Sequence, residues 1–533
     1  MNAQSPASGS GRQLILAAVC LAALVLPLSF SGGAVATPAI GRELGGSAAA
    51  LTWITNAFML SFGSLLMAAG ALADQFGRKR LFVIGLGGFI ATSLALSAAP
   101  SVAWLDALRG LQGVVAAASL SSGAAALAQE FDGHARTRVF SLLGTSFGVG
   151  LAFGPLMAGV LIEQFGWRAI FVVIAAIGIV AFVFGVPRMR ETRDPDAAGL
   201  DLPGTLSFTA ALALFTFGVI EAPASGWGST RVVLLLALAA LCLAVFVTVE
   251  RRVKRPMLDL SLFRYPRFVG VQILPVGTCY CYIVLVVMLP LRFIGADGLG
   301  EIDAGLLMIG LSAPMLIVPM LVASLARRVS AGLLSGIGFL IAAAGLWWLS
   351  RIDFGAARGE LVLAMLVIGT GAGMPWGLMD GLSVSVVPKE RAGMAAGIFS
   401  TTRVAGEGIA LAIATAVLAA LAHTRLADVA ANWQADAPAR LAEAARRLTA
   451  GDLPHAAAVL PEAGRAVLRA SYAEAFTSLL QVLIAITLLS AVATFAFLGR
   501  TAAHDDGDGR DAGEGGERDE RETVPRVKTA AGA

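Results

Sequence analysis

The sequence predicts an all-α integral membrane protein. Hydrophobic residues make up 57% of its 533 residues and charged residues only 14%, whereas soluble domains carry about 25% charged residues. The mean hydropathy is +0.79. The charges gather in short segments between apolar runs, and each run is long enough for a membrane-crossing helix, which needs about 20 residues.

Fourteen apolar runs, bounded by charges or by Gly and Pro, are predicted to span the membrane. Their expected limits are 13–31, 49–72, 81–99, 103–129, 138–162, 168–187, 203–221, 231–250, 267–291, 304–325, 331–349, 360–386, 392–422 and 472–498. Because the number of spans is even, both termini are expected on one side.

The distribution of Lys and Arg predicts which side that is. On the side of the termini, 19 cations lie in short segments: Arg12, Arg78, Lys79, Arg80, Arg136, Arg138, Arg188, Arg190, Arg193, Arg251, Arg252, Lys254, Arg255, Arg264, Arg267, Arg327, Arg328, Lys389 and Arg391. The opposite short loops hold six: Arg42, Arg168, Arg231, Arg292, Arg351 and Arg358. The positive-inside rule therefore predicts cytoplasmic termini in a cytoplasmic (inner) membrane.

The sequence also predicts the location and structure of the three longest segments outside the spans. Residues 1–12 are expected to be a cytoplasmic N-terminus, and the apolar run that follows is interpreted as a retained first helix rather than a cleaved signal peptide, because many more spans follow it. Segment 423–471 would be extracytoplasmic; it is Ala-rich with leucines at helical spacing, which predicts a small helical cap. Residues 501–533 are rich in Asp, Glu, Arg and Gly, which is typical of a disordered cytoplasmic tail.

Several classes of function find no support in the composition. All four cysteines lie in apolar segments, and neither they nor the four histidines have metal-ligand spacing. None of the four lysines follows a glycine, so a Walker A loop is absent. No catalytic His/Asp/Glu cluster stands out near either membrane interface. We therefore expect no enzyme, no metal, no cofactor and no nucleic-acid partner.

The segment Gly70–Arg80 is a charged turn between two predicted spans. It holds Asp74 and the cations Arg78, Lys79 and Arg80, with Gly70 and Gly77 allowing a tight bend. One interpretation is an ordinary cytoplasmic turn that follows the positive-inside rule. The other is a functional element, which depends on the family resemblance described below.

The fourth span carries charge in the sequence Arg109-Gly110-Leu111-Gln112-Gly113. An arginine inside a span is costly unless it faces a partner or water. Asp106 lies one turn earlier on the same helix face, so a static ion pair with Arg109 is one interpretation. The other places Arg109 on the proton or substrate path, where it holds or perturbs a carboxylate.

The fifth span is rich in small residues: Gly144, Gly148, Gly150, Gly154, Pro155 and Gly159 lie within 16 residues. Glycines four apart leave a groove that another helix can approach closely, and Pro155 removes a backbone hydrogen bond. The pattern is compatible with generic close packing or with a specialised interface.

Together these motifs resemble the major facilitator superfamily, and within it the 14-span drug:proton antiporter family (EmrB/QacA type). Gly70, Asp74, Gly77, Arg78 and Arg80 match the signature loop between helices 2 and 3. Gly150, Gly154, Pro155 and Gly159 are similar to the antiporter motif, and Arg109 and Gln112 to the R-x-x-Q-G element.

The resemblance implies the major facilitator fold: an N-terminal six-helix bundle (13–195), two inserted linker helices (196–255) and a C-terminal six-helix bundle (256–500). It also implies secondary active efflux, in which protons exchange for amphipathic organic compounds by alternating access. The antiporter motif is thought to separate exporters from uptake relatives.

One departure from the family bears on ion coupling. Members usually carry an acid in the first span, where this chain has Ser29. Serine cannot cycle a proton near neutral pH, so coupling would need another carboxylate. Glu407, four residues after Arg403 in the thirteenth span, and Asp380 in the twelfth are the candidates. Glu407 either cycles a proton or forms a fixed bridge to Arg403.

The substrate cavity is expected between the two bundles. Its candidate lining residues are Gln112, Met374, Trp376 and Met379. The two methionines and the tryptophan offer a polarisable, adaptable wall that suits varied apolar ligands. The missing first-span acid also allows an alternative, a dedicated exporter of one endogenous metabolite with different ion coupling. The expected partners are a small-molecule substrate, protons and the lipid bilayer; we expect a functional monomer, and a periplasmic adaptor protein is an open partner.

Overall fold

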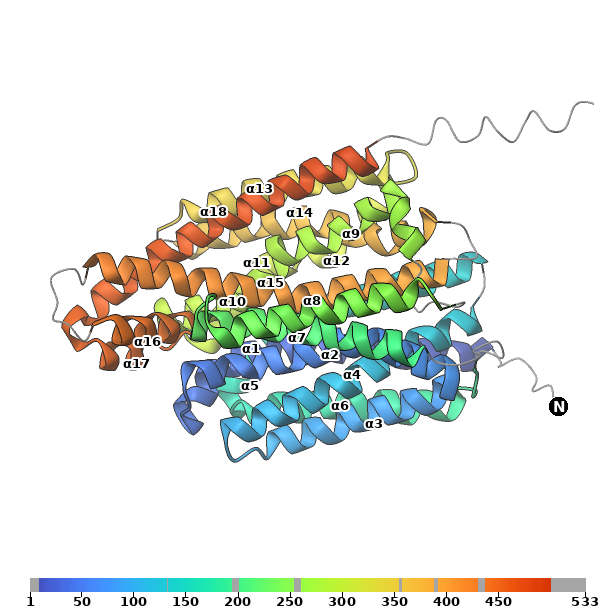
Figure 1. Cartoon of the computed structure of the whole chain (residues 1–533), viewed down its shortest axis with the longest axis horizontal. Coiled ribbons are helices and arrows are strands. Elements are labelled where there is room, and N and C mark those ends of the chain that lie inside the picture. Colours follow the sequence, from blue (N-terminus) through green and yellow to red (C-terminus); the bar gives the residue numbers. More distant parts are fainter. Residues whose placement is uncertain are drawn as a thin grey trace, which may run out of the picture. The chain divides into compact units, whose positions relative to one another are not determined.

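A computed structural model of the chain describes residues 9–131, 133–193, 201–253, 260–353, 357–387, 392–429 and 437–499. Over these residues the long helices run side by side along one common direction (Figure 1). Fourteen of the described helical segments are long and apolar enough to cross a membrane. The described residues thus agree with the predicted number of spans, and the predicted tail 501–533 lies outside them.

The helix bounds follow the apolar runs closely. The described helices are α1 (Gly9–Leu44), α2 (Ala48–Phe76), α3 (Arg78–Ser97), α4 (Val102–Glu130), α5 (Gly133–Phe165), α6 (Arg168–Gly185), α7 (Leu202–Ser225), α8 (Thr230–Glu250), α9 (Pro266–Thr278), α10 (Val284–Leu291), α11 (Glu301–Ser312), α12 (Pro314–Leu325), α13 (Ala331–Ser350), α14 (Arg358–Ser385), α15 (Ala392–Val429), α16 (Ala437–Thr449), α17 (Leu453–Val459) and α18 (Gly464–Leu498), with short helical turns between some of them.

Helices α1, α15 and α18 extend clearly beyond the predicted spans. The first helix begins at Gly9 and continues to Leu44, well past the expected end at residue 31. Pro27 and Pro38 lie inside it, and hydroxyl groups bond back to nearby carbonyls, as from Ser31 to Pro27 and from Thr37 to Gly33. The last helix begins at Gly464 rather than near residue 472. Glycine and proline do not end α1, which continues through Gly32, Gly33 and Pro38, and Arg465 and Arg469 lie in the first turns of α18 ahead of its apolar stretch.

Helices α1 to α6, which we call the first half, pack chiefly in the pairs α2 with α4, α1 with α5 and α3 with α4. In the second half, α9 to α18, the main pairs are α13 with α14 and α13 with α18. Contacts between the halves are extensive, and the described residues form one compact unit. The division into two six-helix bundles therefore stays a prediction.

The ninth span departs from regular α-helix. Two π-helical turns, η3 (Cys279–Ile283) and η4 (Arg292–Ala296), interrupt it on either side of α10. Turns of this kind are rare and are frequent at functional sites. Pro275 and Pro290 lie just before the two turns, and each lacks the amide hydrogen that would continue an ordinary helical ladder.

The two inserted helices, α7 and α8, pack on each other and along the junction of the halves. Helix α7 contacts both α2 and α15, with the Trp53 and Phe217 rings 5.3 Å apart. Most of α8 is exposed, which suits a helix that faces lipid.

The segment predicted as a cap is helical where it is described. Helices α16 and α17 lie together at one end of the bundle (Figure 1), which we call the cap end; the turn after α2 lies at the opposite end, the motif end. Arg447 of α16 donates a hydrogen bond to the Gly46 carbonyl between α1 and α2. The cap is shorter than predicted, because α15 continues to Val429 and α18 begins at Gly464.

Candidate functional site

The signature turn at the motif end is a compact hydrogen-bonded unit. Arg78 donates two bonds to Asp74 Oδ1, at 2.9 Å from Nε and 2.7 Å from Nη2. Gly77 has φ +115°, a conformation that favours glycine. A Cβ at Gly77 would also lie 2.3 Å from a carboxylate oxygen of Glu191.

Glu191, which follows α6, completes this turn. Its two carboxylate oxygens accept the backbone N–H groups of Lys79 and Arg80, at 3.2 Å each, and its charge is favourable at the N-terminus of α3. The turn therefore ties α2 and α3 to the end of α6 within the first half. Gly70 lies within α2, before the turn, and a Cβ at this position would be 3.0 Å from Ser121 Oγ of α4.

A fully buried polar network lies in the first half around Arg109, whose exposed fraction is 0%. Its Nε donates to the Ile54 carbonyl at 2.8 Å, and its Nη1 donates to Ser29 Oγ at 2.9 Å and to Gln112 Oε1 at 2.6 Å. The guanidinium also lies 4.5 Å from the centre of the Phe58 ring. Gln112 extends the network by donating to Ser93 at 2.8 Å.

The expected ion pair between Asp106 and Arg109 is not formed. The described acceptors of Arg109 are all uncharged, and Asp106 Oδ1 is buried with no hydrogen-bond partner among the described residues. The reason is tertiary, because the Ile54 carbonyl and Ser29 draw the guanidinium across toward α2 and α1. Gln112, predicted to line the substrate cavity, is instead part of this network inside the first half.

The glycines of the antiporter motif use two faces of α5. On one face, a Cβ at Gly150 would lie 2.1 Å from the Leu24 carbonyl and one at Gly154 would lie 1.7 Å from Ser31 Oγ, so α1 touches the backbone there. On the other face, a Cβ at Gly159 would lie 2.3 Å from the Glu301 carbonyl of the second half. Pro155 lies inside the helix between these positions.

Two more glycines bring the second half against α5. A Cβ at Gly144 would lie 3.0 Å from Asp380 Oδ2, and one at Gly148 would lie 3.3 Å from Trp376 Nε1. Both neighbours belong to α14. Close packing by small residues is therefore real in this span, and it serves contacts within the first half and between the halves alike.

Arg403 and Asp380 form an ion pair in the second half. Arg403 Nη1 lies 3.0 Å from Asp380 Oδ1 and 3.3 Å from Oδ2. The guanidinium also lies 5.4 Å from the Phe147 ring centre of α5. The Asp380 side chain is 33% exposed. The pair thus connects α15 with α14 and stands against α5 of the first half.

Glu407 has no part in that pair. It is 1% exposed, and its Oε1 has no hydrogen-bond partner among the described residues. The fixed bridge between Glu407 and Arg403, which i,i+4 spacing allows, gives way to the pair of Arg403 with Asp380. The neighbouring turns of α15 contact Met59 of α2 at Gly408 and Cys279 of η3 at Gly406.

The predicted cavity-lining residues of α14 separate in the structure. Trp376 and Met379 are buried in the large core that joins the halves. The Trp376 ring centre lies 6.3 Å from that of Tyr282 in η3. Met374 instead belongs to a cluster with Val322, Leu334 and Leu378, between α12, α13 and α14. Met374 is therefore packed inside the second half, away from the first.

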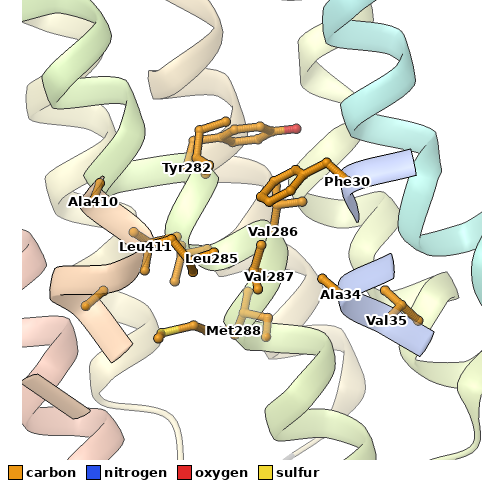
Figure 2. Packing of buried hydrophobic residues seen from close by; sticks show 14 of the residues in the cluster. Phe30, Ala34, Val35, Tyr282, Leu285, Val286, Val287, Met288, Ala410 and Leu411 are labelled. Carbon is orange, nitrogen blue, oxygen red and sulfur yellow. The ribbon is translucent and has the colours of Figure 1, made fainter. Parts of the chain in front are cut away.

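Apolar side chains from both halves fill most of the junction between them. Figure 2 shows Val287 and Met288 of α10 together with Ala34 and Val35 of α1, with Leu411 of α15 beyond. A small pocket with about 40 Å³ of space for water lies among them, enough for a few molecules. Its lining comes from α1, α2, α10, α15 and the cap: Ala34, Thr37, Leu51, Thr52, Thr55, Asn56, Val287, Met288, Leu291, Leu411, Thr415, Thr449 and Ala450.

The arrangement of these side chains is characteristic of one class of protein. Buried charged and polar side chains lie inside membrane-spanning helices at the junction of two helix groups, a placement typical of membrane transporters. The described residues hold no group of three or more His, Cys, Asp or Glu side chains suited to a metal.

The chain belongs to the Major Facilitator Superfamily, whose family model matches residues 19–411. It is 30% identical over 439 residues to a tetracenomycin C resistance and export protein of Streptomyces glaucescens, covering 82% of this chain and 81% of the relative. It is 32% identical over 391 residues to the multidrug resistance protein Stp of Mycobacterium tuberculosis, covering 72% of each. The family resemblance is confirmed, and the chain is a transporter rather than an enzyme.

A solved structure supports the fold independently. A bacterial homologue of the human lysosomal transporter Spinster superimposes with a TM-score of 0.62 at 15% identity, covering 93% of this chain and 100% of that one. The similarity confirms an all-α major facilitator fold.

Proposed function

We propose that this protein is an efflux transporter that exchanges protons for amphipathic organic compounds of the antibiotic type by alternating access. The named relatives act in antibiotic resistance and export, which supports this class of cargo. The observation that carries the coupling proposal is Glu407, a buried carboxylic acid with an unpaired oxygen in the middle of α15.

Charge counting around Glu407 supports a protonation cycle. Arg403 is the guanidinium near it, and Arg403 already pairs with Asp380. One cation cannot neutralise two carboxylates, and an unpaired charge within a span costs several kcal/mol. Glu407 is therefore expected to be neutral when Arg403 pairs with Asp380, and to ionise when Arg403 turns toward it or when water enters.

The test is transport by the purified protein in proteoliposomes with an imposed pH gradient. Tetracenomycin C serves as a first substrate because a relative is named for its export. We expect gradient-driven movement with the wild type, and movement only down the drug's own concentration gradient with Glu407→Gln. Glu360→Gln is the matched control, since Glu360 is exposed at the start of α14. Transport by Glu407→Gln against the concentration gradient of the drug would contradict the coupling proposal.

A dedicated exporter of one endogenous metabolite is the second candidate. Ser29 favours this candidate. It occupies the position where the Arg109 network would otherwise hold an acid, and without that acid the network has no group to bind a cationic drug. A susceptibility panel separates the two candidates. Protection of cells against several unrelated compounds supports a multidrug exporter, and protection against a single compound supports the dedicated one.

The orientation completes the proposal. The motif end faces the cytoplasm of an inner membrane and the cap end faces outward, in keeping with 19 cations against six in the short loops. The protein acts as a monomer, alone or with a periplasmic adaptor. The test introduces a single cysteine at Asp353 or at Glu191 and adds a membrane-impermeant thiol reagent to intact cells. We expect the cysteine at Asp353 to be labelled and the one at Glu191 to be protected. Labelling at Glu191 would show that the orientation is the opposite one.

A further inference from the structure

Three polar groups lie buried in the second half: the Tyr282 hydroxyl of η3, the Ser312 hydroxyl of α11 and the Trp376 Nε1 of α14. The two hydroxyls have only each other as a hydrogen-bonding neighbour, and Trp376 Nε1 has no hydrogen-bond partner among the described residues. Tyr282 is fully buried and Trp376 is 5% exposed. The Arg109 network does not include them.

Such groups are exceptional in a folded interior. An unpaired N–H or O–H in an apolar surrounding costs about 1–3 kcal/mol, and buried polar groups are nearly always paired. Tyrosine and tryptophan fill space well while a polar group at the ring edge seeks a partner. Trp376 Nε1 has no partner, and the Tyr282 hydroxyl has only the Ser312 hydroxyl beside it, which indicates that a further partner is supplied in another state of the protein.

The geometry shows where that partner would lie. The Tyr282 and Trp376 rings are 6.3 Å apart between centres with an angle of 57° between their planes. Trp376 Nε1 lies 3.3 Å from where a Cβ would stand at Gly148, so it is aimed at the bare backbone of α5. Figure 2 shows Tyr282 extending toward the side where Phe30 of α1 lies. Both donors therefore lie at the junction of the halves.

The π-turn explains how Tyr282 comes to face the junction. Tyr282 belongs to η3, where the extra residue of a π-turn rotates the following side chains relative to a regular helix. Ser312 stands at the end of α11, immediately before the break at Ala313 and Pro314. Each group thus lies at an irregular point of its span, where a transporter builds its ligand site.

We propose that Tyr282 and Trp376 form an aromatic subsite that binds a planar aromatic compound bearing a hydrogen-bond acceptor oxygen. The rings stack against the ligand, and the Tyr282 O–H and the Trp376 N–H donate to its carbonyl or phenolate oxygen when the halves separate. Gly148 lets the α5 backbone pack closely against Trp376 Nε1, where a Cβ would lie only 3.3 Å away, so this edge of the ring becomes accessible when the halves separate. The subsite rests on the proposed export function and names the substrate class for it.

The test is equilibrium binding to the purified full-length protein in detergent, without a pH gradient. The probe is 1,4-dihydroxyanthraquinone, a planar three-ring compound with carbonyl and phenolic oxygens. Tyr282→Phe and Trp376→Phe keep an aromatic ring and remove one donor each. We expect each variant to bind the probe about tenfold more weakly, the effect of one lost hydrogen bond in a buried site. Gly148→Val, which fills the space before Trp376, should weaken binding as well.

Two control variants establish whether weaker probe binding is specific to the proposed subsite. Tyr265→Phe and Trp347→Phe make the same chemical changes at exposed positions, where Tyr265 is 39% and Trp347 61% exposed, and should bind as the wild type does. Thermal unfolding of each variant establishes that it is folded.

Each outcome decides the proposal. Loss in the two site variants with retention in the controls supports it. No binding to the wild type, or equal binding by the wild type and both site variants, overturns it. Binding that follows the proposal while pH-driven transport is absent leaves the subsite standing and removes the proton-coupled export function instead.

Discussion

Ser29 accepts a hydrogen bond from Arg109 at 2.9 Å, at the position where members of the antiporter family usually carry an acid. The buried guanidinium is thus surrounded by a carbonyl, a hydroxyl, an amide and the Phe58 ring. Its Nη2 has no described hydrogen-bond partner. The first half therefore holds a positive charge whose described hydrogen-bond acceptors are all uncharged, whereas Glu407, the acid that we propose for coupling, lies in the second half.

Ser29→Asp should stabilise the protein, because it places a carboxylate beside Arg109 Nη1. A buried charge without a partner is strongly unfavourable, so we expect a gain on the order of 1–3 kcal/mol. Thermal unfolding in detergent at neutral pH measures it. Ser29→Asn has the same size and no charge; if it stabilises equally, the gain is not electrostatic.

Asp380→Asn should destabilise the protein, because Arg403 would lose its carboxylate while 8% of its side chain is exposed. Asp380 is itself partly exposed, so the loss should be about 1–3 kcal/mol rather than the larger value of a fully buried pair. Glu474→Gln removes the partner of Arg425 in an exposed pair. Its thermal unfolding should change by less than about 1 kcal/mol, and an equal effect would contradict the special role of the Arg403 pair.

Gly150→Ala should weaken the contact between α1 and α5. The new methyl group would stand 2.1 Å from the Leu24 carbonyl, a backbone atom that cannot turn away. Gly397→Ala, where nothing lies within 4 Å, should instead be neutral or stabilising by up to about 1 kcal/mol, the usual helix preference for alanine. Parallel unfolding curves compare the two. Shifts of the same sign would mean that close approach at Gly150 is not limiting.

The cap should loosen in acid through Glu443. Burial opposes ionisation of this carboxyl, but hydrogen bonds from Arg446 and Arg447 outweigh it and hold its pKa below the ordinary 4.5. A lowered pKa contributes stability above the unfolded value, and that stability is lost as the pH falls through the folded value.

Hydrogen exchange of α16 at one pH below 4.5 and one near 7 measures the effect. Wild type and Glu443→Gln are compared at each pH, so intrinsic rates cancel. We expect the wild type to be better protected near pH 7 and the two to converge in acid. A constant difference at both pH values would contradict the assignment.

The spans could be predicted because bilayer thickness fixes their length and charge marks their ends. The end at Leu44 differs from the prediction because Gly32, Gly33 and Pro38 lie inside α1 instead of ending it. The start at Gly464 differs because Arg465 and Arg469 belong to α18 ahead of its apolar stretch, and hydropathy has no signal for charged helical turns.

The polar partners were harder to predict than the spans. Spacing along α4 pairs Asp106 with Arg109, but an acceptor on α2 and another on α1 compete for the same guanidinium. Spacing along α15 likewise favours Glu407 for Arg403, and Asp380 of α14 takes its place. Glu191 carries no motif, and its role appears only when the end of α6 meets α3.

The π-turns η3 and η4 change how the ninth span should be compared with its relatives. Each inserts a residue beyond the 3.6 per turn of a regular helix, so side chains beyond it are rotated by about 100°. A relative lacking one residue between Cys279 and Ile283 would present a different side chain where Tyr282 now stands. In the aromatic subsite that we propose, a one-residue deletion there would exchange the side chain that meets the cargo without altering any other residue.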